Sequence, residues 1–344
     1  MNKMIENLKI NDGKSIVHLN KAQNKFRIEL NHKIKTNEYA FEGVSCAICG
    51  ENSFNRIASK DRYGFYSPVS ICENCGLVQL NPRMNSESYS KFYQYEYYPL
   101  YFGKSTFTEE TFIWQYFRGK KIFDIISNRL GRSLKSSFVL DVGCGPGGIL
   151  KYFKEKGNSV LGFELDKKSI EFGNSRGIDI TDESFGKFEK TADLIICCHV
   201  LEHLLDPVSY LNEIREKLKK DGLFYVEIPL LENINREYFG EIAKCFQNAH
   251  VYYFTKVSLE NLARKSGFRI VWGENLAYSL WFKCDKDEQY VNDFKNVNFL
   301  IDSYSGKARI LLSRGKVINS LSLFLRKIGV ELFLKRIYFW IKTR

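Results

Sequence analysis

The sequence lacks any uncharged run that approaches the roughly eighteen residues needed to cross a membrane as a helix. This excludes a membrane-spanning helix. The first thirty residues are interrupted by charges throughout, so they also lack the apolar centre of a cleavable signal peptide. We therefore expect the protein to stay in the cytoplasm, where a reducing environment disfavours disulfide bonds.

Basic charge is scarce outside the last part of the chain. The net charge is +11, but residues 303–344 contain ten Lys or Arg and one Glu, which leaves only +2 for everything before them. A groove that follows a phosphate backbone needs basic charge on the body of the protein. Nucleic acid is therefore an unlikely partner by sequence. We find no internal repeat and no low-complexity segment.

What is present fits one α/β domain of about 150 residues with extensions on both sides. Hydrophobic residues make up 44% of the chain, which is enough for a substantial core. We divide the chain into an extension (1–40), a cysteine module (41–83), an aromatic and helical connector (84–136), an α/β domain (137–285) and a basic tail (286–344). Within the connector we expect a helix over 109–130.

Short strands alternate with helices from Ser137 onward, a pattern typical of a parallel sheet wrapped by crossover helices. The sequence predicts a Rossmann-like, doubly wound sheet of seven strands whose final strand can run antiparallel. We expect strands at 137–143, 159–165, 178–180, 192–198, 223–230, 268–274 and 278–284, with helices at 148–157, 167–177, 207–222 and 256–267. Gly222 and Gly267 are placed at left-handed helix ends.

The segment VLDVGCGPGG at 139–148 puts glycines directly between a strand and a helix. Gly143, Gly145 and Gly147 leave the backbone open to a ligand, and the helix start offers free N–H groups. Asp141 would repel a pyrophosphate but suits an ammonium group or an ordered water. Glu164, at the end of the next strand, is placed to accept ribose hydroxyl hydrogens. The alternatives are a simple tight turn or a nicotinamide dinucleotide site.

Four cysteines occur as two pairs, CAICG and CENCG, with 22 residues between the pairs. Two such knuckles bend backbone N–H groups toward the sulfurs, and four thiolates satisfy tetrahedral Zn²⁺ with no open position. The spacing therefore predicts a structural zinc site at Cys46, Cys49, Cys72 and Cys75; the alternative is four incidental cysteines. The other five cysteines are expected to be apolar filler.

The loop DVGCGPG, together with the later segment LEHLLDP, resembles the class I S-adenosylmethionine-dependent methyltransferases over about residues 137–285. The resemblance implies that the acid and glycines of the loop, with Glu164, bind the cofactor S-adenosylmethionine. It also places Asp182 beside the adenine, and His199 and His203 at the pocket edge after the fourth strand.

A cysteine module ahead of such a domain is similar to bacterial methyltransferases that act on nucleotide-linked deoxysugars and surface glycans. The matching pieces are ICENCGLVQLNPR, the strip YQYEYYPLYFG and NAHVYYFT. The resemblance implies a catalytic histidine at His250. Sugar C-methyltransferases have Glu before this histidine, where this chain has Ala249, so we expect transfer to a hydroxyl or amine. Tyr95, Tyr97 and Tyr98 are candidates for substrate stacking; interdomain packing is the alternative.

Methyl transfer from a sulfonium needs mainly alignment, because the leaving group departs neutral. A base serves only to collect the acceptor's proton, and histidine suits that role near neutral pH. His250 is the first candidate and His203 the second, although His203 could simply orient the following helix.

The segment at 316–344 places Lys and Ser along one side of an otherwise apolar helix. This pattern is typical of a helix lying in a membrane interface, so we hypothesise a peripheral position at the inner membrane face. Packing on the body or on a second subunit is the alternative. An RNA methyltransferase and a cofactor-binding scaffold without turnover stay open as rival functions. No Asn-Pro-Pro-Tyr base-flipping motif is present.

Overall fold

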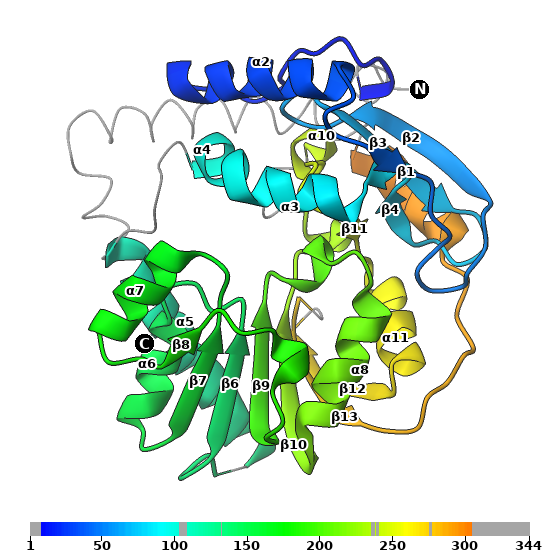
Figure 1. Ribbon diagram of the computed structural model, residues 1–344. Coiled ribbons are helices and arrows are strands. Elements are labelled where there is room, and N and C mark those ends of the chain that lie inside the picture. The colour runs from blue at the N-terminus through cyan, green and yellow to red at the C-terminus, as the bar shows by residue number, and fades with distance from the viewer. Residues whose placement is uncertain are drawn as a thin grey trace.

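A computed structural model of the chain describes residues 8–102, 109–131, 133–234, 238, 241–274 and 277–304. Its largest element is a seven-stranded sheet with the order β12-β13-β10-β9-β6-β7-β8 (Figure 1). Only β13 runs antiparallel to its neighbours, pairing with both β10 and β12. The predicted doubly wound sheet is confirmed. The strands are Phe138–Val142 (β6), Ser159–Phe163 (β7), Ile180–Thr181 (β8), Ala192–Cys198 (β9), Leu218–Glu227 (β10), Phe268–Glu274 (β12) and Tyr278–Lys283 (β13).

Helices cover both faces of this sheet, because its central strands are apolar on both sides. In β9, Leu194 and Ile196 face the core beneath α5 and α6, whereas Ile195 and Cys197 face the core beneath α8 and α11. The helices that flank the sheet are Glu109–Leu130 (α5), Gly148–Glu155 (α6), Lys167–Ser175 (α7), Pro207–Lys217 (α8) and Lys256–Lys265 (α11).

Helix α8 ends earlier than the sequence predicts. We expected it to run to Gly222, but it ends at Lys217, and β10 begins at the next residue, Leu218, which pairs with Ala192 of β9. Gly222 therefore lies inside a strand and has no left-handed conformation, so that prediction was wrong. Pairing with β9 outweighs the helical propensity of these residues. Gly267 does adopt φ +75° just after α11, as expected.

The cysteine module forms a second sheet with the order β11-β4-β3-β2. Three of its strands belong to the module, whereas β11 lies much later in the chain, after β10. Strand β11 pairs with β4, with Tyr252 opposite Gln79 and Tyr253 opposite Val78. The module and the methyltransferase-like region thus share one sheet. The strands are Phe54–Lys60 (β2), Tyr66–Cys72 (β3), Val78–Leu80 (β4) and Tyr252–Tyr253 (β11), with a separate pair Phe41–Glu42 (β1) and Arg83–Met84 (β5).

Two tyrosine-rich helices, α3 and α4, lie between α2 and the large sheet, with the module beside them (Figure 1). They pack near α2, which begins after the capping residue Asn20 and is tied to them by an ion pair of 2.6 Å between Lys33 and Glu96. The bounds are Lys21–Lys35 (α2), Ser86–Tyr95 (α3) and Tyr97–Phe102 (α4), with short helices at Ile242–Cys245 (α10), Phe185–Lys187 (η1), Leu201–His203 (η2) and Leu231–Asn233 (η3).

Beyond β13 the described chain continues to residue 304, and residues 294–304 are helical. The basic segment 316–344, for which we expect membrane contact, lies outside the described residues. Within the described residues, no helix combines the length and the apolar character required to pass through a bilayer.

Candidate functional site

The glycine loop follows β6 and is held in a shape that requires glycine. Gly143, Gly145 and Gly147 have φ values of +72°, +54° and +80°. A Cβ atom on Gly143 would lie 2.6 Å from Val200 Cγ2, so the loop also passes close to the chain that follows β9. The backbone of this loop is therefore shaped for close approach.

Asp141, at the end of β6, is the most unusual acid of the site. Its side chain is buried, and among the described residues neither carboxylate oxygen has a hydrogen-bond partner. Burial raises the pKa of this carboxyl well above its usual value, although Arg118 pulls the other way. A buried carboxylate is costly unless a hydrogen-bond donor contacts it. The ammonium group of a bound methionine moiety would be such a donor.

Glu164 directly follows β7 and organises the loop from the neighbouring strand. One carboxylate oxygen, Oε2, accepts the N–H of Gly145 at 2.8 Å. The other, Oε1, accepts the N–H groups of Leu165 at 2.7 Å and Asp166 at 2.9 Å. Oε1 thus uses both of its lone pairs, whereas Oε2 keeps one to which a ribose hydroxyl can still donate. Asp182 lies exposed just beyond β8.

His199 follows β9 in a left-handed conformation, φ +57°, which is rare for a residue with a side chain. Its Nδ1 lies 3.3 Å from Glu202 Oε1 and its Nε2 lies 3.3 Å from Glu227 Oε1. Burial disfavours the charged ring, but hydrogen bonds to the two carboxylates outweigh it and raise the pKa of His199 to about 9. Arg118 also reaches Glu227, at 3.3 Å.

His203 and His250 meet at the other side of the site, although they are far apart in sequence. Their ring centroids lie 4.8 Å apart with the rings perpendicular. One donor atom each of Glu202, His203 and His250 lies within 4.8 Å of the others. Burial lowers the pKa of His203, and it lowers that of His250 well below the usual value, with the charges of His203 and Arg62 adding to the effect. Both rings are therefore neutral near pH 7.

The tyrosines of α3 and α4 form a wall beside this histidine pair. Tyr97 lies 6.4 Å from His203 between ring centroids and stacks on Tyr101 at 4.7 Å, while Tyr93 Oη lies 3.0 Å from His203 Nδ1. Of the residues chosen from sequence, the structure brings Tyr97 to the histidines. Tyr95 is 58% exposed, on the opposite side of its helix, and the side chain of Tyr98 lies outside what the structure describes.

Sequence reasoning missed several residues of this site. Glu202 and Glu227 bracket His199, and Tyr93 and Tyr101 extend the wall. A signal for the wall was present, because Tyr89, Tyr93, Tyr97 and Tyr101 recur at four-residue spacing, which places them on one helical face. Nothing comparable marked the glutamates, which reach His199 from different elements.

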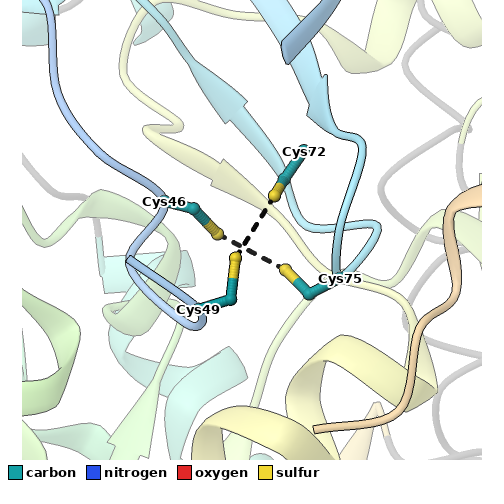
Figure 2. Close-up of side chains that lie close together, drawn as sticks. All are labelled: Cys46, Cys49, Cys72 and Cys75. Atoms are coloured by element: carbon teal, nitrogen blue, oxygen red, sulfur yellow. Dashed lines mark hydrogen bonds between the residues drawn. The ribbon is translucent and has the colours of Figure 1, made fainter. Parts of the chain in front are cut away.

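The four module cysteines converge on one point (Figure 2). The Sγ atoms of Cys46 and Cys75 lie 3.4 Å apart, as do those of Cys49 and Cys72. Sulfurs bound tetrahedrally to Zn²⁺ at about 2.3 Å lie roughly 3.8 Å apart, so a small expansion would accommodate the ion. Gly50 and Gly76, after each pair, have φ of +78° and +80° and complete the knuckles. The donor set fits zinc.

Residues 114–272 match a family model described as "Methyltransferase domain". The C-methyltransferase NovU of Streptomyces niveus is 25% identical over 252 residues, which cover 66% of this chain and 56% of that protein. A ubiquinone biosynthesis O-methyltransferase of Hydrogenovibrio crunogenus is 21% identical over 192 residues, 49% of this chain and 76% of that protein. This chain thus spans little more than half the length of the first of these relatives.

Among solved structures, the magnesium protoporphyrin IX methyltransferase ChlM of Synechocystis, with bound SAH, aligns at a TM-score of 0.40 and 14% identity over 57% of this chain and 94% of that one. The strand order, the glycine loop and the family match agree on the same region. Residues 114–272 are thus similar to a methyltransferase domain.

Proposed function

We propose that the protein transfers the methyl group of S-adenosylmethionine to a hydroxyl or amine of a nucleotide-linked sugar or cell-surface glycan. One observation carries this proposal: a neutral histidine pair, His203 and His250, lies directly beyond the turn that contacts the cofactor loop. Val200, which touches the Gly143 position, is followed three residues later by His203. A base therefore stands next to the place where the methyl group would be presented.

The cofactor supplies an electrophilic methyl group, and the chain's own residues hold and orient it. Asp141 accepts the ammonium group, Glu164 accepts a ribose hydroxyl, and Asp182 is assigned to the adenine side, with His199 at the pocket edge. This arrangement is supported by the unpartnered oxygens of Asp141 and by the contact between Glu164 and Gly145. Alignment of acceptor and methyl group contributes most of the rate.

His250 is the proposed base, and Gln247 sets which ring nitrogen is free. The side-chain amide nitrogen of Gln247 contacts His250 Nε2, and the amide oxygen has no hydrogen-bond partner among the described residues. An amide nitrogen only donates, so Nε2 is the acceptor in this arrangement. A role as base through Nδ1 requires the amide to turn over, so that its oxygen accepts the Nε2–H and Nδ1 carries the lone pair for the acceptor's proton. His203 stands behind it, with Nδ1 on the Tyr93 hydroxyl.

The atom that receives the methyl group is proposed from the residue before the base. Ala249 is fully buried and offers no carboxylate to His250. A hydroxyl or amine loses its proton as the new bond forms, so a single neutral imidazole suffices. Relatives named as C- and as O-methyltransferases both resemble this chain, so they favour neither outcome.

We further propose that the cysteine cluster holds a structural Zn²⁺. Four thiolates leave no open position on the ion, so it would stabilise the module and take no part in the transfer. The ion would add to a core that the module strands share with the rest of the chain. A peripheral position at the inner membrane face, through the basic segment 316–344, is proposed from sequence alone; loss of flotation with anionic liposomes after removal of that segment tests it.

The function is tested by comparing cells that carry the wild-type gene, His250→Gln or no gene. Mass spectrometry of the nucleotide-sugar pool and the surface glycan should show loss of one methylene in the last two. Calorimetry of purified His250→Gln should show unchanged binding of S-adenosylhomocysteine. His18→Gln, at an exposed histidine, is the matched control. Absence of cofactor binding by the wild type would refute the proposal, and RNA binding that salt abolishes would favour the rival function.

A further inference from the structure

Arg62 is a cation of the cysteine module that reaches the acceptor side of the methyltransferase domain. It lies in the loop between β2 and β3, and its backbone N–H donates to Phe246 O at 2.8 Å. The preceding residue, Asp61, accepts the backbone N–H of Asn248 at 3.0 Å. These contacts fix the loop against the segment that leads into His250.

The guanidinium of Arg62 is held on several sides, but none of these direct contacts is with a carboxylate of the described residues. One nitrogen, Nη1, donates to Lys244 O at 3.2 Å, and Nη2 donates to Tyr63 Oη at 2.9 Å. The group lies over the rings of Tyr63 and Tyr101, 4.9 Å and 5.5 Å from their centroids. Tyrosine rings attract a cation but carry no negative charge to cancel it.

No carboxylate of the described residues forms an ion pair with Arg62, and its Nε has no hydrogen-bond partner although that atom is buried. The neighbouring Asp61 interacts with Arg62 through its charge, but both of its oxygens accept backbone N–H groups, those of Tyr63, Phe65 and Asn248. An arginine is always charged, and a largely buried guanidinium with unused N–H groups is costly. Within the described residues, these N–H groups can still bind an anion.

A chain of ring contacts links Arg62 to the histidine pair. Tyr101, beneath the guanidinium, stacks on Tyr97, and Tyr97 faces His203. Tyr101 Oη also accepts the backbone N–H of Ala249 at 3.2 Å, next to the proposed base. An acceptor whose reacting group lies at His250 could thus extend along the tyrosines to Arg62.

We propose that Arg62 binds a phosphate group of the acceptor, so that the substrates are sugar phosphates or sugar diphosphates. The inference rests on the proposed function and sharpens its substrate class. Two of the five N–H groups of Arg62 are used, which leaves Nε–H and one N–H on each of Nη1 and Nη2. A phosphate presents several oxygens to these donors and can bind the guanidinium through two of them.

A purely structural clamp is the competing explanation, because Lys244 O would also be lost as a partner on substitution. The experiment therefore uses full-length protein saturated with S-adenosylhomocysteine and measures binding of inorganic pyrophosphate and of uridine diphosphate by calorimetry. Arg62→Gln removes the charge, and Arg62→Lys keeps the charge but loses the fork. Arg56→Gln, at an exposed arginine of the same module, is the matched control.

We expect wild type and Arg56→Gln to bind pyrophosphate with equal affinity, and Arg62→Gln to bind it at least tenfold more weakly. The affinity of Arg62→Lys should lie between these two values, and its unfolding temperature should be unchanged. Tighter binding of uridine diphosphate than of pyrophosphate would identify a nucleotide-linked acceptor, and equal binding a phosphate alone. The inference is overturned if wild type binds neither probe, if Arg56→Gln weakens binding equally, or if glucuronate binds in their place. S-adenosylhomocysteine uptake in the same samples separates this failure from failure of the proposed function.

Discussion

The proposed cofactor side and the proposed acceptor side of this site are built in different ways. The cofactor side comes from one continuous stretch of chain, in which Asp141, the glycine loop and Glu164 follow consecutive strands β6 and β7. The acceptor side gathers Arg62 of the module, Tyr97 of the connector, and His203 and His250 of the domain. The comparison teaches that the domain fixes the cofactor side by itself, whereas the acceptor side depends on how the module docks.

Specific contacts hold the module in place. Strand β11, which comes directly after His250, pairs with β4 of the module. Arg83 Nη1 donates to Leu205 O at 2.6 Å, and Lys265 Nζ donates to Ile48 O, beside a cysteine knuckle, at 2.6 Å. Damage to the module should therefore displace His250 while leaving the glycine loop intact.

The largest effect is expected from loss of the metal. Cys75→Ser should remove one of four ligands, release zinc and unfold the module, because structural zinc supplies much of the folding free energy of such modules. We expect methyl transfer to vanish and hydrogen exchange to rise across residues 61–65 and 250–254. Binding of S-adenosylhomocysteine, measured by calorimetry, should change less than about threefold, or under 1 kcal/mol.

Cys284→Ser is the control, since Cys284 lies outside the cluster. It should retain zinc by elemental analysis and transfer methyl groups as wild type does. Equal loss of cofactor binding and of transfer in Cys75→Ser would show that the two sides are not independent.

The opposite effect, disruption of the cofactor side with the module intact, is expected from Gly148→Ala. A Cβ atom there would lie 2.2 Å from Phe112 O and 2.6 Å from Gln115 Cβ, where α5 packs against the start of α6. Gln115 Oε1 also accepts the Gly148 N–H at 3.0 Å. We expect a loss of about 2–3 kcal/mol in the free energy of unfolding, from overpacking against backbone, together with weaker cofactor binding.

Urea unfolding followed by tryptophan fluorescence measures this cost. Gly43→Ala is the control, because a Cβ atom at Gly43 would meet nothing within 4 Å. Hydrogen exchange in the cysteine module should stay unchanged in Gly148→Ala. Destabilisation equal to that of Gly43→Ala would mean that α5 moves aside freely.

Between the two sides, Asp61 joins the module loop to the segment before His250, and its charge should make that joint depend on pH. Burial raises the pKa of Asp61 from 3.8 to about 6, despite three backbone N–H donors. The folded state therefore holds the proton more tightly than the unfolded state. The resulting stability is full below pH 3.8 and is lost as pH rises through 6, by about 3 kcal/mol.

This contribution is isolated by subtracting the free energy of unfolding of Asp61→Asn from that of wild type at each pH from 4 to 8. The difference should fall by about 2–2.5 kcal/mol between pH 4 and 7. Asp182→Asn, at an exposed acid beyond β8, should show no such fall. A flat difference for Asp61→Asn would mean that the carboxylate is ionised throughout.

The same contrast explains what the sequence could and could not predict. The glycine loop, Glu164 and the cysteine knuckles carry local signals, since φ and spacing constrain each within a few residues. The helix before β10 was misjudged because Leu218 pairs with Ala192, a contact with no local signature. Arg62 was missed for the same reason: only the docking of the module brings it beside Tyr101.

The smallest effect is expected at His199, which bridges the two sides through Glu202 and Glu227. Its pKa is raised to about 9 by hydrogen bonds to these carboxylates that outweigh burial, so its stabilising contribution is present below pH 6.5 and lost as pH rises through 9. The side chain is 45% exposed, so solvent screening should reduce the contribution to about 1 kcal/mol.

The difference in free energy of unfolding between wild type and His199→Gln should therefore fall by about 1 kcal/mol between pH 6 and 9.5. The same difference between wild type and His18→Gln should not change. Neutral His199 leaves Glu202 without its countercharge beside His203, so methyl transfer should also change over the same pH range. If the difference is flat while transfer still varies with pH, the two sides communicate through the position of this ring, and its left-handed backbone, φ +57°, becomes the feature to alter next.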